Sequence, residues 1–566
     1  MSRPDAESEE GGEGAPPGAA KPPASMARDA AEITAANVLS RVTGLVRVAA
    51  VAGALGTTFL GNTYQTANLV SNVLFELLAA GLLSSVLVPP FVGMLDRGHR
   101  DDAERVAGAV LGVALVVLGT VAVVGMVGRT SIMRAMTVAV DDPAVRAEEV
   151  RLGSFLLLLF LPQVLLYAVG AVATALLHGA RRFRAAALAP VANNVVVVAT
   201  MAVFWVVRPE DGMSGTTGFD LPASARWVLG AGTTAGVAAM TIVALAGLRR
   251  AGLHLRPRWD PRRPELANLA RSGAWAAAYL ALGQGLVATT LVLANRVEGG
   301  VVAYHLAFTV FLLPHAVLAH PTMTAVYPRL AAEAAGRHWR SFADALAGSS
   351  ATVVFLVAPA AALLVALGRP ALSLLRLGSL DMAGTGLAGR VLVAYAVGLV
   401  GYAGFQLLTR ASYAAGDTRS PALVNSGVAL GGSVLMLVLF GAAGANDRVV
   451  VLGVAHSVAM MVGAAALLVI VDRRVGGRCL RTASLLRGLP AGAAAGVTAR
   501  LVADLVPGES RLAALVAVAM GGTAGIVVYL AGQWWMRAPE LTLLRARRLA
   551  VASPGNGPDP AREGAS

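Results

Sequence analysis

The sequence predicts an all-α polytopic membrane protein with about fourteen transmembrane helices in two pseudo-symmetric lobes. Three observations predict this class. Hydrophobic residues make up 56% of the chain and charged residues only 14%, apolar stretches of about 20 residues recur, and arginines gather between those stretches. Because soluble proteins carry about 25% charged residues, much of this surface must face lipid.

The predicted membrane domain lies between two polar tails. Residues 1–30 and 537–566 are polar or rich in Pro and Gly and have no apolar core, so both predict disordered cytoplasmic tails. Residues 31–536 are the membrane domain, with an N lobe over about 31–207, a C lobe over about 272–442 and further helices over 448–534. The predicted spans are 33–55, 62–92, 104–128, 150–177, 185–207, 226–248, 272–295, 300–327, 341–367, 388–413, 419–442, 448–471, 484–506 and 511–534.

The distribution of arginine predicts the orientation. Cytoplasmic loops carry more Arg and Lys than exported loops do. Arginine clusters at 181–184, 249–271 and 473–487 fall on one side of the predicted spans, and an opposite loop carries Glu210, Asp211 and Asp220. We therefore expect a multi-pass protein of the cytoplasmic membrane with both termini in the cytoplasm. We expect 129–151 to form an exterior loop.

Composition also argues against several function classes. The formal charge of +13 comes from arginines in short clusters between apolar runs, not from one compact basic domain, so nucleic acid is not an expected partner. The single cysteine, Cys479, leaves no internal disulfide and no thiolate metal cluster. The sequence has no G-x-x-x-x-G-K-[ST] loop, so no ATP-driven motor is expected in the chain. No catalytic residue, metal site or cofactor is predicted.

A repeated motif predicts two related halves. The segments 178–194 and 413–425 both end an apolar helix, turn through arginine and restart with Pro-x-x-x-Asn. Proline suits the first turn of a helix, where its missing N–H costs nothing. Chance recurrence of a common helix start is one interpretation, and a two-lobed transporter that arose by duplication is the other. Asp417, in the second turn, is predicted to be a turn or helix-capping residue.

Two arginines, Arg41 and Arg47, lie inside the first predicted span. A charge within a span is costly and usually faces a cavity or a partner, and arginine can hold phosphate oxygens in a bidentate fork. Six residues correspond to about 600° of helical rotation, so both side chains can reach one ligand only if the helix bends. Gly44 lies between them. The alternative is that one or both extend to the cytoplasmic interface as topology anchors.

The second predicted span carries a polar stripe. Gln65, Asn68, Asn72 and Glu76 recur at three- or four-residue spacing, which places them on one face of an apolar helix. Lining of a cavity is one interpretation, with Glu76 paired to Arg41 or Arg47 or accepting a proton. Hydrogen bonding between packed helices is the other.

Prolines and histidines inside later spans give weaker signals. Pro162, Pro314 and Pro321 predict kinked or broken helices, which a membrane tolerates where neighbours or cavity water satisfy the freed carbonyls. The spacings of His305, His315 and His320 do not place a metal-binding pair on one helical face, so packing or interfacial roles are expected.

Several segments together resemble the MurJ/MviN family of lipid II flippases, within the multidrug/oligosaccharidyl-lipid/polysaccharide exporter superfamily. They occur in the family's order and span most of the membrane domain, and the stretch 64–81 is most similar to the variant of high-G+C Gram-positive bacteria. The matching pieces are Ser40–Arg47, Tyr64–Gly81, Arg182–Pro190, Leu313–Pro314 with Tyr327–Leu330, and Gly416–Pro421.

The resemblance implies fourteen helices around a cationic central cavity and transfer of undecaprenyl-pyrophosphate-linked peptidoglycan precursor from the inner to the outer leaflet. Arg41 and Arg47 fall on the family's first-helix arginines, which engage the pyrophosphate. The chain departs from the family in four respects, one of which is that the tripeptide Leu-Pro-Asn common in the second helix reads Val70-Ser71-Asn72. Asn62 stands where an acidic residue is common, and two further cavity arginines fall near Phe75 and Thr309.

The resulting hypothesis is a lipid II flippase that works by alternating access, without a cofactor. Arg41 and Arg47 bind pyrophosphate, and Asn68, Asn72 and Glu76 contact sugar or balance charge. The expected partners are lipid II or a related polyprenyl-pyrophosphate glycan and membrane lipids. The open alternatives are export of another polyprenyl-linked glycan, a drug or ion antiporter of the same superfamily, and a non-transporting scaffold that binds cell-wall synthesis or division proteins.

Overall fold

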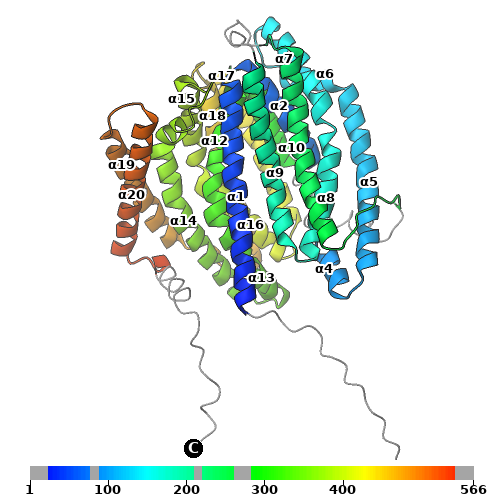
Figure 1. Ribbon diagram of the computed structural model, residues 1–566. Helices are drawn as coiled ribbons and strands as arrows, with labels where there is room; N and C mark the ends of the chain where they lie inside the picture. Colours follow the sequence, from blue (N-terminus) through cyan, green and yellow to red (C-terminus); the bar gives the residue numbers. More distant parts are fainter. Residues whose placement is uncertain (1–22, 77–87, 209–218, 261–281, 542–566) are drawn as a thin grey trace, which may run out of the picture.

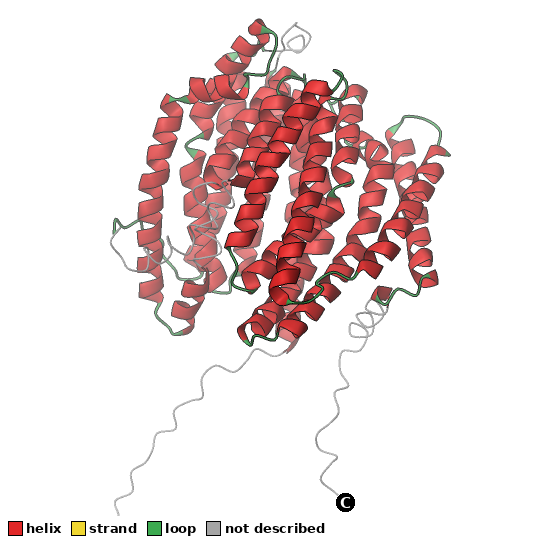
Figure 2. Ribbon diagram, turned by 180° about the vertical axis from the view of Figure 1, so that it is seen from behind, coloured by secondary structure: helices red, strands yellow, loops and turns green. Residues whose placement is uncertain are grey.

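A computed structural model describes residues 23–76, 88–208, 219–260 and 282–541, with only the backbone described for 23–37, 75, 88 and 89. The described residues form long, roughly parallel helices and no strand (Figures 1 and 2). Within these described ranges, ten helical spans are long and apolar enough to cross a membrane. The pair Met382–Ala396 and Leu399–Ala414, bent by 51°, makes an eleventh.

The other three of the fourteen predicted spans also correspond to helices. One is Phe59–Phe75, at whose end the described chain stops. Another is the short apolar helix Leu282–Ala294, which begins where the description resumes. The third is Thr482–Asp504, which is 23 residues long but carries Arg487, Arg500 and Asp504 and is less apolar.

The first half of the chain forms one lobe. Its helices pack on one another, with α9 between α1 and α10 and with α8 against α5 and α10. The bounds are α1 (Pro23–Leu55), α2 (Phe59–Phe75), α4 (Val88–Asp96), α5 (Arg100–Val127), α6 (Arg129–Met136), α7 (Pro143–Phe160), α8 (Gln163–Gly179), α9 (Phe183–Val207) and α10 (Ala223–Arg250).

The second half forms the other lobe, in which α18 packs against α15, α16 and α17, and α12 against α15. Its main apolar core is a separate cluster from those of the first lobe, and α1 contributes Val48 and Ala52 to it. The bounds are α12 (Gly300–Pro314), η2 (His315–Ala319), α13 (His320–Ala335), α14 (Trp339–Ser373), α15 (Met382–Ala396), α16 (Leu399–Ala414), α17 (Arg419–Ala442) and α18 (Arg448–Val475).

Two last helices, α19 (Thr482–Asp504) and α20 (Arg511–Trp535), form a hairpin at the edge of the second lobe (Figure 1). They pack on each other and on α14. Glycines permit this close approach: an added Cβ at Gly496 would lie 3.1 Å from the Ala362 carbonyl oxygen, and one at Gly521 only 2.6 Å from that of Ala499.

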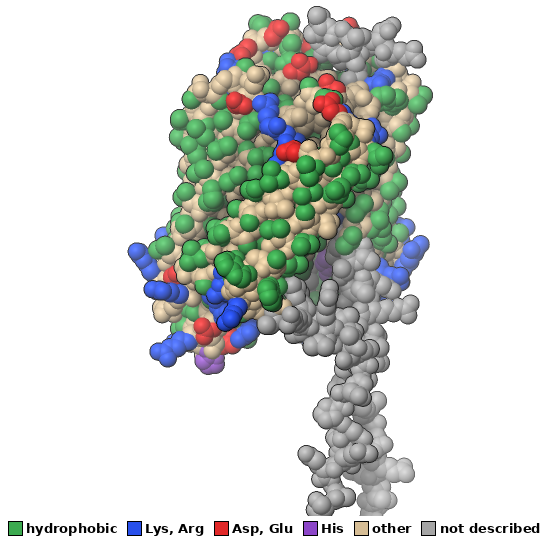
Figure 3. Space-filling view, turned by 90° about the vertical axis from the view of Figure 1, so that its left-hand side faces the viewer, with side chains coloured by type: hydrophobic (Ala, Val, Ile, Leu, Met, Phe, Trp, Pro, Cys, Tyr) green, Lys and Arg blue, Asp and Glu red, His purple; other side chains and the backbone are tan. Residues whose placement is uncertain are grey.

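The outer surface of the bundle is apolar, as a lipid-facing surface requires. Val206 is 82% exposed, and Val127, Leu505 and Leu486 are also largely exposed, each on a helix of the bundle or at its end. Figure 3 shows hydrophobic side chains over the middle of one face and charged side chains gathered towards its two ends. A soluble monomer rarely exposes so large an apolar area.

The two ends of the bundle differ in charge. At the lower end in Figure 1, where α1 begins and α20 ends, the α8–α9, α10 and α18 termini carry Arg181, Arg182, Arg249, Arg250, Arg473 and Arg474. At the upper end, where the α1–α2 turn lies, carboxylates such as Asp141, Asp142, Asp381 and Asp447 occur. The arginine clusters predicted to share one side therefore lie at one end of the molecule.

The repeated motif forms the same turn twice. After α8, Arg181 N donates to His178 O and Arg182 N to Leu177 O, and after α16, Gly416 N donates to Tyr413 O and Asp417 N to Ser412 O. Arg181 (φ 55°) and Gly416 (φ 73°) both adopt the left-handed conformation that closes such a helix end. The same hydrogen-bond pattern also closes α4 and α10, so the two turns alone do not decide between duplication and chance recurrence.

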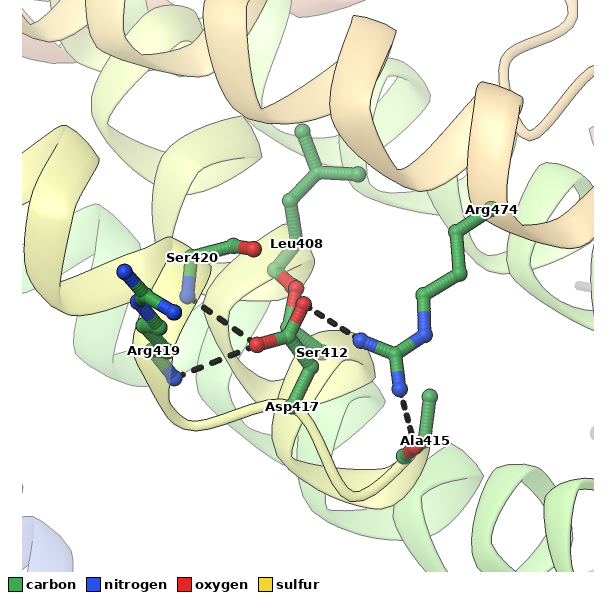
Figure 4. Close-up of polar contacts among 7 residues, drawn as sticks. All are labelled: Leu408, Ser412, Ala415, Asp417, Arg419, Ser420 and Arg474. Atoms are coloured by element: carbon green, nitrogen blue, oxygen red, sulfur yellow. Dashed lines mark hydrogen bonds and ion pairs between the residues drawn. The ribbon is translucent and has the colours of Figure 1, made fainter.

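Asp417 has the capping role that the sequence predicts (Figure 4). Its Oδ1 accepts hydrogen bonds from the backbone N–H groups of Arg419 (3.1 Å) and Ser420 (3.0 Å), in the first turn of α17. Its Oδ2 pairs with Arg474 of α18, which also donates to the Ala415 carbonyl. One carboxylate thus joins the ends of α16, α17 and α18.

The predicted prolines do interrupt helices. The break between α7 and α8 falls at Leu161–Pro162, and Pro314 precedes the single π-helical turn η2. Pro321 lies in the first turn of α13, where its missing N–H is tolerated.

The predicted exterior loop 129–151 is largely helical, and that prediction is wrong in this respect. It contains α6 and the start of α7, whose first residue is Pro143 and whose N-cap, Asp142, accepts hydrogen bonds from Ala144 N and Val145 N. The predicted tails, 1–30 and 537–566, lie outside the described residues, except for 23–30 at the start of α1 and 537–541 after α20.

Candidate functional site

The candidate arginines lie on an unbroken α1. Gly44 introduces no break, and an added Cβ there would lie 3.7 Å from the amide nitrogen of Asn194 on α9. That amide donates to Thr43 Oγ1 (3.0 Å) and fixes this stretch of α1 against the first lobe. Since α1 does not bend here, Arg41 and Arg47 point to different surroundings.

Arg47 lies between the lobes. Its charge acts on Tyr64 of α2, Tyr167 of α8 and His305 of α12. The side chain is half-buried, and its buried Nε has no hydrogen-bond partner among the described residues. Buried polar groups are normally paired, so an unpaired guanidinium is suited to hold an anion.

One residue of the predicted polar stripe, Asn72, lies near Arg47. Asn72 accepts a hydrogen bond from the Tyr167 hydroxyl (3.1 Å), and the same Tyr167 feels the Arg47 charge. Asn68 is 7% exposed, and the described residues offer its amide no hydrogen bond. Asn72 of the stripe thus lies close to Arg47.

Glu76 has a different partner from either predicted arginine. Its carboxylate accepts a hydrogen bond from Gln284 of the helix Leu282–Ala294, in the second lobe. This bond joins the lobes below the level of Arg47. Residues 77–87, which follow Glu76, lie outside the described residues.

Arg41 belongs to a second cationic group nearer the lower end. Its charge acts on His315 in η2 and His320 in α13, as does that of Arg410 on α16. Arg410 also contacts the His320 Nδ1 at 3.1 Å. Arg410 is not among the predicted site residues, although a charge inside the predicted span 388–413 is a signal for it.

The upper end of the site is sealed by hydrogen bonds between the lobes. Ser379 N donates to Gly53 O (2.7 Å), and Arg208 donates to Ser379 Oγ (2.9 Å). Arg296 pairs with Asp141 (2.8 Å), and Asn295 donates to the Met136 carbonyl.

Asn62 explains one departure from the family pattern. Its Nδ2 donates to Val297 O (2.9 Å) and its Oδ1 accepts from Val301 N (2.9 Å), both in the other lobe. An ionised carboxylate at this position could accept but not donate. Of the other departures, Thr309 bonds its own helix at His305 O, and the Phe75 side chain lies outside the described residues.

Comparisons with known proteins agree with this architecture. The family model described as "Lipid II flippase MurJ" matches residues 51–523. A probable lipid II flippase MurJ of Rhizobium meliloti is 28% identical over 74% of this chain and 76% of its own length. The lipid II flippase MurJ of Burkholderia cenocepacia is 24% identical over 69% and 74%, respectively.

Solved structures show the same fold. A lipid II flippase MurJ in an inward closed conformation superposes with a TM-score of 0.70 at 17% identity, over 89% of this chain and 98% of that one. An inward-facing multidrug resistance MATE family transporter gives 0.61 at 15% identity, over 77% and 94%. The chain is thus a multi-pass membrane protein, and it belongs to the lipid II flippase MurJ family.

Proposed function

We propose that this chain moves lipid II from the inner to the outer leaflet by alternating access, with both termini in the cytoplasm. The observation that carries the proposal is Arg47, a half-buried and unpaired guanidinium between the two lobes. A pyrophosphate offers it the charge-assisted bidentate partner that the described residues do not supply.

The position of the hydrogen bonds between the lobes supports loading from the cytoplasm. Hydrogen bonds join the lobes at the upper end, and the arginine-rich termini lie at the lower end. With the lower end in the cytoplasm, as positive charge favours, Arg47 is closed off from the exterior. Arg41 and Arg410 lie nearer the entrance and offer an incoming anion a first cationic contact.

An apolar groove supports a lipid-linked substrate. A cavity of about 910 Å³ lies between α14, α16, α18 and α19. Its wall is almost entirely aliphatic, so it suits an isoprenoid chain and not a head group. The residues lining it include Ala358, Leu408, Met461, Leu485, Leu489 and Val497.

Complementation tests the proposal. The chain replaces the essential lipid II flippase of a host, alongside Arg47→Ala, Arg47→Lys and the control Arg105→Ala, an exposed arginine paired with Asp102 on α5. Loss of a charge-assisted bond of about 1.5–3 kcal/mol predicts at least a tenfold loss of translocation in Arg47→Ala. Arg47→Lys recovers only part, because lysine keeps the charge but not the fork.

Membrane abundance of each variant is measured in the same cells. Growth and outward lipid II transfer with the wild type and Arg105→Ala, but not with equally abundant Arg47→Ala, support the proposal. A well-inserted wild type that never restores transfer would mean another polyprenyl-linked substrate or a scaffold role. Unchanged transfer by Arg47→Ala would exclude Arg47 as the pyrophosphate site.

A further inference from the structure

A second cavity, of about 210 Å³, lies inside the second lobe. Its walls come from the helix Leu282–Ala294 and from α12, α15, α16, α17 and α18, and the described residues lining it include no charged side chain. Neutral hydrogen-bonding groups alternate with aromatic rings around it. The rings are Tyr304, Phe308, Tyr395, Tyr402 and Phe405, and the other polar residues are Gln284, Thr290, Gln406, Asn425 and His456.

His456 is the least satisfied of these groups. The residue is only 8% exposed, its ring lies 5.0 Å from that of Tyr395 and 5.7 Å from that of Phe308, and its buried Nε2 has no hydrogen-bond partner among the described residues. The described residues also give no partner to the hydroxyls of Tyr304 and Tyr395. Because buried polar groups are normally paired, these three call for an occupant that forms hydrogen bonds.

The electrostatic surroundings favour a neutral occupant. The described residues that line the cavity are all uncharged, and Arg47 is not among them. A charged ligand would lose its hydration here with no charged side chain on the wall to compensate. Aromatic faces attract polarised C–H groups, and amides, hydroxyls and imidazole bind hydroxyl groups.

A similar Gly–Asn contact lies near the cationic site in the first lobe and near this cavity in the second. Asn194 faces Gly44 of α1 in the first lobe, and Asn425 of the repeated motif faces Gly283 in the second, where an added Cβ would lie 3.4 Å from its amide nitrogen. Three residues after Gly44 comes Arg47, whereas three residues after Gly283 comes Leu286, which lines the cavity. After the two Gly–Asn contacts, the first lobe thus has an arginine where the second lobe has an uncharged cavity.

The cavity adjoins the lobe interface. Gln284 lines it and also donates a hydrogen bond to Glu76 of the first lobe. Tyr304 on its wall precedes His305, which lies within reach of the Arg47 charge. When the charged part of a head group is bound at Arg47, its uncharged part therefore has this uncharged cavity close by.

We propose that this cavity binds a neutral sugar ring. That the ring belongs to the head group of a polyprenyl-linked glycan rests on the proposed function, whereas sugar binding itself does not. Ordered water is the alternative occupant.

Saturation-transfer NMR with free N-acetylglucosamine tests the cavity alone, on the purified full chain. We expect transfer with the wild type, a several-fold weaker signal with Tyr395→Phe, which removes one unpaired hydroxyl, and none with His456→Phe. The same exchange at a distant site, His178→Phe on α8, should change nothing. Absence of transfer with the wild type, or equal transfer with His456→Phe, would overturn the proposal.

Binding of two lipids then identifies the source of the sugar. Undecaprenyl pyrophosphate carries no sugar and lipid II carries a disaccharide, so His456→Phe should weaken only lipid II binding, about tenfold, whereas Arg47→Ala should weaken both. If free sugar binds but neither lipid does, the cavity proposal stands and the proposed function fails. If His456→Phe weakens the binding of both lipids equally, the cavity does not bind the sugar and the proposal fails.

Discussion

Arg474 Nη1 lies 2.5 Å from Asp417 Oδ2, so the end of α18 is tied to the first turn of α17 by an ion pair. The same carboxylate caps α17 through its other oxygen. Capping and ion pairing are thus combined in one residue, and substitutions can separate them.

Asp417→Ala should lower stability more than Asp417→Asn. Alanine removes both the cap and the ion pair, and loss of a cap costs about 0.5–2 kcal/mol. Asparagine keeps an oxygen that accepts the Arg419 and Ser420 N–H groups and loses only a partly exposed ion pair worth about 0–1 kcal/mol. Thermal unfolding in detergent measures both. Equal losses for the two variants would contradict a capping role.

The Asp417 ion pair should also make stability depend on pH. Burial alone would raise the pKa of this carboxyl, but hydrogen bonds from Ser420 and the charge and hydrogen bond of Arg474 outweigh burial and hold the pKa below its usual value. A pKa that is lower in the folded than in the unfolded state stabilises the protein. This stabilisation is complete above the unfolded value of about 3.9 and is lost as the pH falls below it.

The stability difference between the wild type and Asp417→Asn should therefore stay constant from about pH 6 to 8 and shrink below about pH 4. Thermal unfolding across that range measures it. A stability difference that grows on acidification would contradict a lowered pKa of Asp417.

Cys479 should resist alkylation in the folded protein. The residue is fully buried, and burial together with its contact to Asp472 raises the pKa of the thiol to about 12. Since the thiolate is the reactive form, a maleimide at pH 7.5 should label it slowly in detergent and quickly after denaturation, as mass spectrometry can follow. Complete labelling of the folded chain within minutes would contradict this.

Asn62→Asp should favour separation of the lobes at the upper end. The carboxylate cannot donate to Val297 O, and an unsatisfied buried acceptor costs about 1–3 kcal/mol. Spin labels at Asp220 and Met382, in a Cys479→Ser background, should show a larger long-distance population by double electron–electron resonance. Asn446→Asp, exposed in the α17–α18 connection, is the matched control. Identical distance distributions in all three chains would exclude Asn62 as part of the seal.

The sequence predicts the helices well because each must supply an apolar length set by the bilayer. The same rule fails at 129–151, where a capping Asp142 and Pro143 begin a helix before its apolar part starts. The N-cap residue and the proline that follows it are local signals for the start of this helix, and a pattern based on hydropathy alone does not register them.

The site is less predictable, because its residues are placed by tertiary contacts. Charge inside a span singled out Arg41 and Arg47, and helical spacing singled out Asn68 and Asn72. The position of Arg47 within reach of His305, more than 250 residues away, follows from the docking of two lobes. Local sequence equally gives no indication that Glu76 meets Gln284.

The α19–α20 hairpin has an evolutionary consequence. Because it packs mainly on α14, it can be lengthened, retilted or lost in descent by altering one interface, and neither lobe needs to be rebuilt. Divergence between relatives should therefore accumulate on this hairpin and on the α14 surface that faces it, while the two lobes change slowly.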